Sequence, residues 1–151
     1  MEDNSLKLLI EEAIKVSMKG RERERTTTLR MAMSEIKKQE IDKKSDLDKE
    51  EITLLIQRMI KQRKDSSNQF QSAGREELAL KEAREIKILS EFLPAQLSEK
   101  EIIEVVKQVV ETLNAKTTQD IGRVMSSLKT NLQGKADLSL VSKIVKESLT
   151  K

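Results

Sequence analysis

A single proline, Pro94, interrupts a chain of 151 residues whose apolar side chains otherwise recur every three or four positions. That spacing is typical of amphipathic helices, because it places the apolar side chains on one face. The chain has only four glycines, too few for short strands joined by tight turns. With two Phe and neither Trp nor Tyr, the core must be built from aliphatic side chains and Met. The pattern predicts an all-α fold.

Pro94 also predicts where the chain divides. A proline disfavours helical backbone at the preceding residue, so the helix before it must end at or before Leu93. Ser98 and Glu101 then form an S-x-x-E capping box, which is typical of a helix start. We expect an N-terminal antiparallel helical domain over residues 1–94 and a small C-terminal three-helix domain over residues 95–151.

Apolar stripes and capping residues predict four helices before the proline and three after it. Leu9 belongs to the first stripe, and Gly20 is expected to end that helix. Asp48 with Glu51, a close relative of the capping box, is expected to begin the third helix. The helix after Ser98 carries β-branched residues on more than one face, which predicts a central position. The expected ranges are 5–19, 21–42, 49–70, 76–93, 99–113, 118–130 and 137–149.

The absence of Cys and His excludes much chemistry. Disulfides, thiolate catalysis, zinc–thiolate sites and Ser-His-Asp or Cys-His arrangements cannot form within this chain. Two acidic pairs, Glu50–Glu51 and Glu76–Glu77, fall in expected first turns of helices, where they complement the helix dipole. We predict no catalytic residues, no metal site and no cofactor.

The net charge of +3 is mild, but part of it is concentrated between Asn114 and Lys135. Gly122 and Gly134 each stand beside a base near an expected helix start. Backbone N–H groups, a helix N-terminus and a cation together can bind phosphate. Alternatively, Gly122 lets its helix pack closely on a neighbour and Gly134 is a turn residue. The basic residues of this segment are Lys116, Arg123, Lys129 and Lys135.

Two other basic runs, residues 21–25 and 61–64, are interpreted as solvated helix faces, with contact to an RNA backbone as the alternative. Phe70 and Phe92 lie on expected buried faces, so reading of single-stranded bases by stacking is not expected. The first residues are acidic and amphipathic. We expect no membrane span and no targeting segment, and therefore a cytoplasmic location.

Four separate blocks, residues 28–42, 60–78, 85–102 and 120–137, resemble in order the YqeY family. Members of that family look like free-standing versions of the C-terminal tail domain of GatB, the B subunit of the glutamine-dependent amidotransferase that converts misacylated tRNA. The family pattern D-M-G-K-V-M with a later G-R-A-D reads DIGRVM and GKAD here, so both basic positions keep their charge. Asn114-Ala115 replaces a frequent Gly-Ala, and Leu138 stands where another Gly is frequent.

The resemblance implies an all-helical protein that contacts the body of tRNA and leaves catalysis to other domains. It points to Lys116, Gly122, Arg123, Lys129, Gly134 and Lys135 as nucleic-acid-binding residues, and to tRNA, with a synthetase or amidotransferase, as partners. Amidotransferase activity by this chain alone is not expected, because only the tail is matched. The alternative is a helical protein–protein adaptor, which an exposed apolar patch on the first four helices would indicate.

Overall fold

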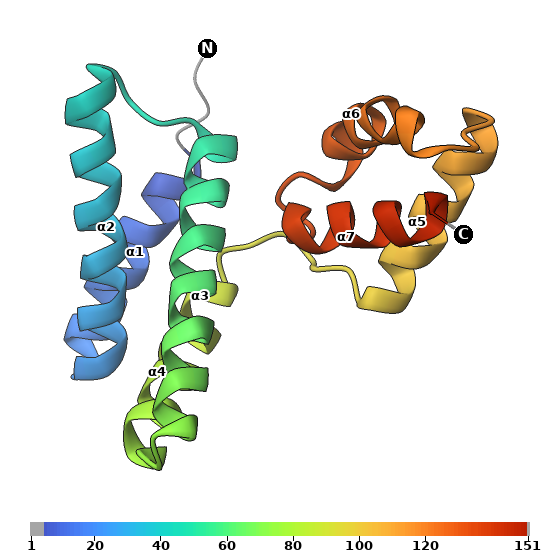
Figure 1. Ribbon diagram of the computed structural model, residues 1–151. Coiled ribbons are helices and arrows are strands. Elements are labelled where there is room, and N and C mark those ends of the chain that lie inside the picture. The colour runs from blue at the N-terminus through green and yellow to red at the C-terminus, as the bar shows by residue number, and fades with distance from the viewer. Residues whose placement is uncertain (1–4, 151) are drawn as a thin grey trace. The chain divides into compact units, whose positions relative to one another are not determined.

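The computed structural model describes residues 5–150 and has an all-α fold, as predicted (Figure 1). No β-sheet forms among these residues. The elements are α1 (Ser5–Lys19), α2 (Arg23–Lys43), α3 (Lys49–Ser72), α4 (Glu76–Ser90), α5 (Glu99–Thr112), the 3₁₀ helix η1 (Thr118–Asp120), α6 (Ile121–Leu132) and α7 (Leu138–Leu149).

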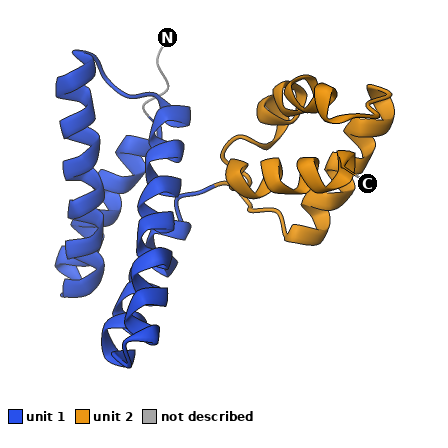
Figure 2. Cartoon of the chain, in the orientation of Figure 1, with its two compact units in different colours: residues 1–93 blue, residues 94–151 orange. Residues whose placement is uncertain are grey.

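The chain divides into two compact units, Met1–Leu93 and Pro94–Lys151 (Figure 2). In the first unit α1 packs on α2, and α3 packs along α4 as an αα-hairpin. Both pairs meet around one aliphatic core. Full burial of one Leu or Ile side chain contributes about 1.5–3 kcal/mol to the stability of the fold. Core side chains exposed by 1% or less include Ile10, Ile36, Ile52, Ile56 and Leu89.

Two ion pairs of the first unit are largely withdrawn from solvent. Arg63 of α3 lies 3.3 Å from Glu85 of α4, measured from Nε to Oε2, and both side chains are 10% exposed. Arg63 also donates from Nη1 to the carbonyl of Met59, although its Nε–H is not aligned for a hydrogen bond. The expectation that residues 61–64 form a solvated face is therefore wrong for Arg63. In the second pair, Lys7 of α1 bonds Glu40 of α2 at 2.9 and 3.0 Å.

The predicted capping boxes are both present. Asp48 and Glu51 cap α3, and Ser98 and Glu101 cap α5, each through reciprocal side-chain-to-backbone hydrogen bonds. The first helix ends at Lys19, as predicted, but the left-handed residue that follows it differs from the prediction. Its left-handed residue is Arg21, with φ of 57°, rather than Gly20, because the 6→1 bond runs from Glu22 N–H to the Ser17 carbonyl.

Two expectations about buried faces are corrected. Leu9 is 61% exposed, since α1 turns Leu6 and Ile10 to the core instead. In the second unit α5, α6 and α7 each pack on the other two, so α5 is not central, and its Ile103 is 46% exposed. The buried residues of that core are Ile102, Val106, Ala115, Val124, Leu128, Leu132, Ala136, Val141, Ile144, Val145 and Leu149.

Loops of the second unit are held by specific backbone geometry. Asn114, with φ of 53°, ends α5 as predicted. Between α6 and α7 the chain reverses at Gly134. Its carbonyl and that of Lys135 accept hydrogen bonds from Gln96 and Leu97, in the segment that precedes α5. From residue 5 to residue 150, the structure has no helix long and apolar enough to cross a membrane.

Candidate nucleic-acid interface

The outer face of α6 carries small and basic side chains. Val124, Leu128 and Leu132 point into the core of the unit and are at most 2% exposed. With about 100° between successive residues, the opposite side of the helix presents a different set, all of it exposed. We call this set the α6 face; its residues are Gly122, Arg123, Ser126, Lys129 and Thr130. The helix itself contains no acidic residue.

Gly122 does not serve close helix packing. A Cβ atom placed on its backbone would meet no other heavy atom within 4 Å. The interpretation that this glycine lets α6 approach a neighbouring helix is therefore wrong. The missing side chain leaves the backbone of α6 uncovered beside Arg123, on a surface exposed to solvent.

The start of the helical stretch is already occupied by a carboxylate of the protein. Asp120 Oδ2 accepts the backbone N–H groups of Lys116 and Thr117 at 3.0 and 3.3 Å. A phosphate approaching this end would meet the charge of Asp120. The candidate surface therefore lies along the α6 face rather than at the helix N-terminus.

Asp120 also holds Arg123, whose Nη2 lies 3.2 Å from Asp120 Oδ1. The two backbone N–H bonds, followed by the guanidinium of Arg123, lower the pKa of Asp120 below its ordinary value. Because the Arg123 side chain is 54% exposed, the ion pair is screened by solvent and leaves the guanidinium able to reach other groups.

Gly134 has a structural role that differs from that of Gly122. Its φ of 84° lies in the left-handed region, and the residue is buried. Its carbonyl accepts a hydrogen bond from Gln96 Nε2 at 2.7 Å, and the next carbonyl, of Lys135, accepts one from Leu97 N–H at 2.9 Å. Gly134 is thus a turn residue, as one of the two interpretations expected, while the Lys135 side chain is exposed.

The predicted basic residues are spread along α6 and on both sides of it in the chain rather than gathered in one cluster. Arg123 and Lys129 lie six residues apart on α6, about 9 Å along the helix axis. Lys116 precedes the helical stretch and Lys135 follows it, both exposed. Cations spread in this way can contact several phosphates of one backbone, but they do not enclose one small anion.

Two residues of the α6 face escaped the sequence reasoning. Ser126 and Thr130 follow Gly122 at intervals of four, so the three share one side of the helix. Hydroxyl groups can donate to phosphate and sugar oxygens. The sequence could have indicated this side of the helix, since positions 122, 126 and 130 carry no large apolar residue.

Within the described residues, no group of three or more acidic side chains is placed to hold a metal ion.

The basic run at residues 21–25 behaves as a solvated, salt-bridged face. Arg25 pairs with Glu22, the N-cap residue of the same helix, and with Glu91, and Glu24 pairs with Arg84 of α4. These pairs join the start of α2 to α4 and to the end of the first unit. That part of the run is therefore explained by intramolecular contacts.

Comparison with known proteins gives a family and three relatives. The sequence profile of a family described as Yqey-like protein matches residues 7–149. Altered inheritance of mitochondria protein 41, mitochondrial, of Kluyveromyces lactis is 40% identical over 87 residues, which are 57% of this chain and 47% of that protein. The protein of the same name from Vanderwaltozyma polyspora is 38% identical over 82 residues, 53% of this chain and 44% of that protein.

Uncharacterized protein C22F3.15 of Schizosaccharomyces pombe is 34% identical over 97 residues, 62% of this chain and 76% of that protein. The chain spans about half the length of the first two relatives. Their names state a connection with mitochondrial inheritance.

Proposed function

The chain belongs to the YqeY family, and we propose that it is a non-catalytic tRNA-binding accessory protein that contacts RNA through the α6 face. The observation that carries the proposal is this face itself. It combines Arg123 and Lys129 with an uncovered backbone at Gly122 and has no acid within the helix. Lys116 and Lys135 add exposed positive charge before and after α6 in the chain.

The type of contact follows from the side chains. Phe70 and Phe92, the two aromatic residues, are half-buried in the first unit, so they offer no platform on which bases could stack. Arg, Lys, Ser and Thr can bind phosphate and sugar oxygens. Recognition would then depend on the position of the backbone and hence on the shape of the RNA. The proposal assigns no reaction to the chain and places it in the cytoplasm, a point to be checked by cell fractionation.

The experiment is binding of the full chain to bulk tRNA and to a duplex RNA of similar charge, followed by fluorescence anisotropy across a salt series. We expect tighter binding to tRNA, with an affinity that falls steeply as salt rises. The test variant is the triple substitution R123Q, K129Q and K135Q. If each base meets one phosphate, the slope of log K against log salt should fall by about 2 to 3.

A matched control removes three exposed lysines of the same unit that lie outside α6: K100Q, K107Q and K143Q. It changes net charge by the same amount and should leave the salt slope almost unchanged. Equal and weak binding of the unmodified chain to both RNAs would overturn the proposal. Equal losses in the test and control variants would overturn the assignment to the α6 face.

A second candidate function, a protein–protein adaptor, is favoured by the outer face of α1. Leu8, Leu9 and Val16 are 61%, 61% and 59% exposed. Exposed aliphatic side chains gathered on one helix are a feature of interaction surfaces. The triple substitution L8S, L9S and V16S separates the two functions, because it should abolish partner binding and leave RNA binding unchanged.

A further inference from the structure

A groove of about 970 Å³ runs between α2 and α3 in the first unit. Thr27, Arg30, Ser34 and Lys38 of α2 line one bank, and Arg58 and Gln62 of α3 line the other. We call it the α2–α3 groove. All six are exposed, and all six are side-chain types that bind phosphate and sugar oxygens.

The bases of the groove differ from other bases of the same unit. Lys7, Arg25, Lys43, Arg63 and Arg84 each lie within ion-pair distance of a carboxylate. Arg30, Lys38 and Arg58 have no such partner among residues 5–150; Arg30 donates from Nη2 to the sulfur of Met18 at 3.2 Å. Three uncompensated cations therefore face one groove.

The order along α2 extends this pattern. Arg23, Arg30 and Lys37 recur every seven residues, so they share one side of the helix at intervals of about 10 Å. Thr27 and Ser34, also seven apart, lie between them. The result is a stripe in which each base alternates with a small hydroxyl residue. Thr27, Arg30 and Ser34 of this stripe line the groove, whereas Arg23 and Lys37 lie outside it.

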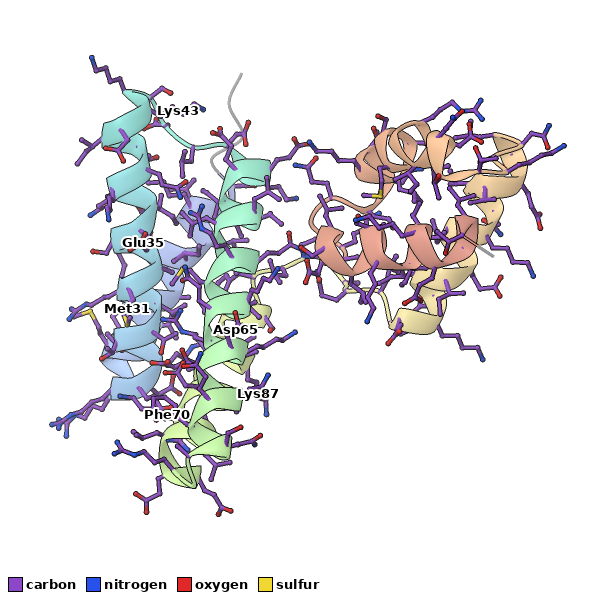
Figure 3. All side chains as sticks on the ribbon, in the orientation of Figure 1. Met31, Glu35, Lys43, Asp65, Phe70 and Lys87 are labelled. Carbon is purple, nitrogen blue, oxygen red and sulfur yellow. The ribbon has the colours of Figure 1, made fainter. Side chains whose placement is uncertain are left out.

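The floor of the groove distinguishes between possible occupants. Leu55 and Met59 are only 2% and 5% exposed, so they offer little apolar surface to a docking peptide helix. Met31 alone adds an exposed apolar side chain, and it projects from α2 together with Glu35 (Figure 3). A peptide helix binds chiefly by burying an apolar stripe. The groove therefore suits a sugar–phosphate chain better.

We propose that the α2–α3 groove is a second RNA-binding surface, in which Arg30, Lys38 and Arg58 contact backbone phosphates of the same RNA. This inference rests on the proposed RNA-binding function and extends it from the second unit to the first. Arg63 also lines the groove, but its charge is paired with that of Glu85, and this buried pair joins α3 to α4. Glu35 is the one acid among the residues that line the groove.

The experiment uses the full chain with bulk tRNA across the same salt series. The test variant carries R30Q, K38Q and R58Q, and the control carries K49Q, K64Q and K87Q, three exposed lysines of the same unit outside the groove. Lys87, for example, extends from α4 away from α2 in Figure 3. We expect the test variant to lose about 2 to 3 from the salt slope and at least tenfold in affinity at low salt.

Glu35→Gln supplies a test that misfolding cannot imitate. Removal of the one acid among the lining residues should increase tRNA affinity about twofold, because like charge repels phosphate. Equal effects of test and control variants, or no gain from E35Q, would overturn the inference. Polyglutamate and unlabelled RNA are compared as competitors at equal charge. If polyglutamate displaces tRNA as well as the unlabelled RNA does, the inference is also overturned, since the groove would then suit an acidic protein segment.

The two proposals fail in distinguishable ways. If the chain binds tRNA and the α6 triple variant weakens binding while the groove variant does not, only the second surface is wrong. If the unmodified chain binds tRNA and the duplex RNA equally and weakly, the proposed function itself is wrong.

Discussion

Asp120 and Arg123 form an ion pair across one helical turn, 3.2 Å from Oδ1 to Nη2, while the other oxygen of the same carboxylate caps the helix start. The carboxylate thus has two effects. It stabilises the entry into α6 through the N–H groups of Lys116 and Thr117, and it offsets part of the positive charge of the α6 face. Stability and charge are coupled at this one side chain.

The substitution Asp120→Asn should therefore act with opposite signs on stability and on RNA binding. Its amide oxygen accepts the backbone N–H groups less strongly, so the thermal midpoint of the second unit should fall. Because a negative charge beside Arg123 disappears, tRNA affinity should rise. Thermal unfolding and anisotropy on the same protein measure both. Reduced RNA affinity of the folded variant would contradict the role given to the α6 face.

The pH dependence of this variant follows from the lowered pKa of Asp120. A carboxyl whose pKa is lower in the folded state stabilises the fold above its unfolded pKa, and this contribution is lost as pH falls through the folded pKa. The stability difference between the unmodified chain and D120N should be present at neutral pH and shrink below about pH 4.

Gly122→Ala should stabilise the protein and weaken RNA binding. A Cβ atom there meets nothing within 4 Å, and Ala is favoured over Gly inside a helix by about 1 kcal/mol. If the RNA backbone approaches the uncovered helix at this point, the added methyl group should reduce tRNA affinity severalfold. Urea unfolding and anisotropy test the two effects. A stabilised variant with unchanged affinity would show that RNA does not approach Gly122.

Two other glycines provide the controls. Gly20→Ala meets only ordinary contacts, the nearest at 3.5 Å to the Val16 carbonyl, and should leave RNA binding unchanged. Gly134→Ala should destabilise the second unit by about 1 kcal/mol or more, because its φ of 84° disfavours any residue with a Cβ. Stabilisation by G134A would mean that the turn between α6 and α7 adopts another conformation.

Thr28→Val should stabilise the first unit by about 1 kcal/mol, since the buried Thr28 hydroxyl has no hydrogen-bond partner among the described residues. Thr26→Val is the matched control. The hydroxyl of Thr26 lies 2.7 Å from that of Ser17 and donates to the Glu22 carbonyl at 2.9 Å, so its loss should destabilise. Urea unfolding of both variants should give changes of opposite sign; a loss in both would contradict the account.

Most of the fold followed from local signals in the sequence. Asp48 and Ser98 began helices where their capping boxes predicted, because a cap depends on residues only three positions apart. The end of α1 at Lys19 was predicted, but the left-handed residue beyond it is Arg21 rather than Gly20, because glycine is the residue usually expected in that conformation. The buried position of Arg63 was also missed, because its partner Glu85 is distant in the sequence and lies on the next helix.

The candidate sites also combine features that the sequence predicts with features that only the structure shows. The exposed positions of Arg123 and Lys129 on one helix could be predicted, because the periodicity of that helix is visible in the sequence. The roles of Gly122 and Gly134 could not be separated without neighbours and backbone angles. The α2–α3 groove was not expected, because Arg58 faces Arg30 and Lys38 only once α3 has folded back beside α2.

The Lys7–Glu40 ion pair should make the stability of the first unit depend on pH. Burial alone would raise the pKa of Glu40, but the Lys7 ammonium and the Leu47 N–H outweigh it, so this pKa is lowered. The hydrogen bond to Glu40 is the main cause that raises the pKa of Lys7. The pair should therefore stabilise the fold between about pH 5 and pH 10 and do so less at both extremes.

Glu40→Gln tests this dependence. The amide can still accept the Leu47 N–H, but the Lys7 charge, whose side chain is only 20% exposed, loses its partner. We expect a loss of about 2 kcal/mol at pH 7 and a flatter profile of unfolding free energy against pH. The control is Arg84→Gln, which breaks an exposed pair with Glu24 and should cost less than about 0.5 kcal/mol. The two ion pairs differ chiefly in how far their side chains are buried. Equal losses of stability in the two variants would therefore mean that solvent screens the Lys7–Glu40 pair as it screens a surface pair.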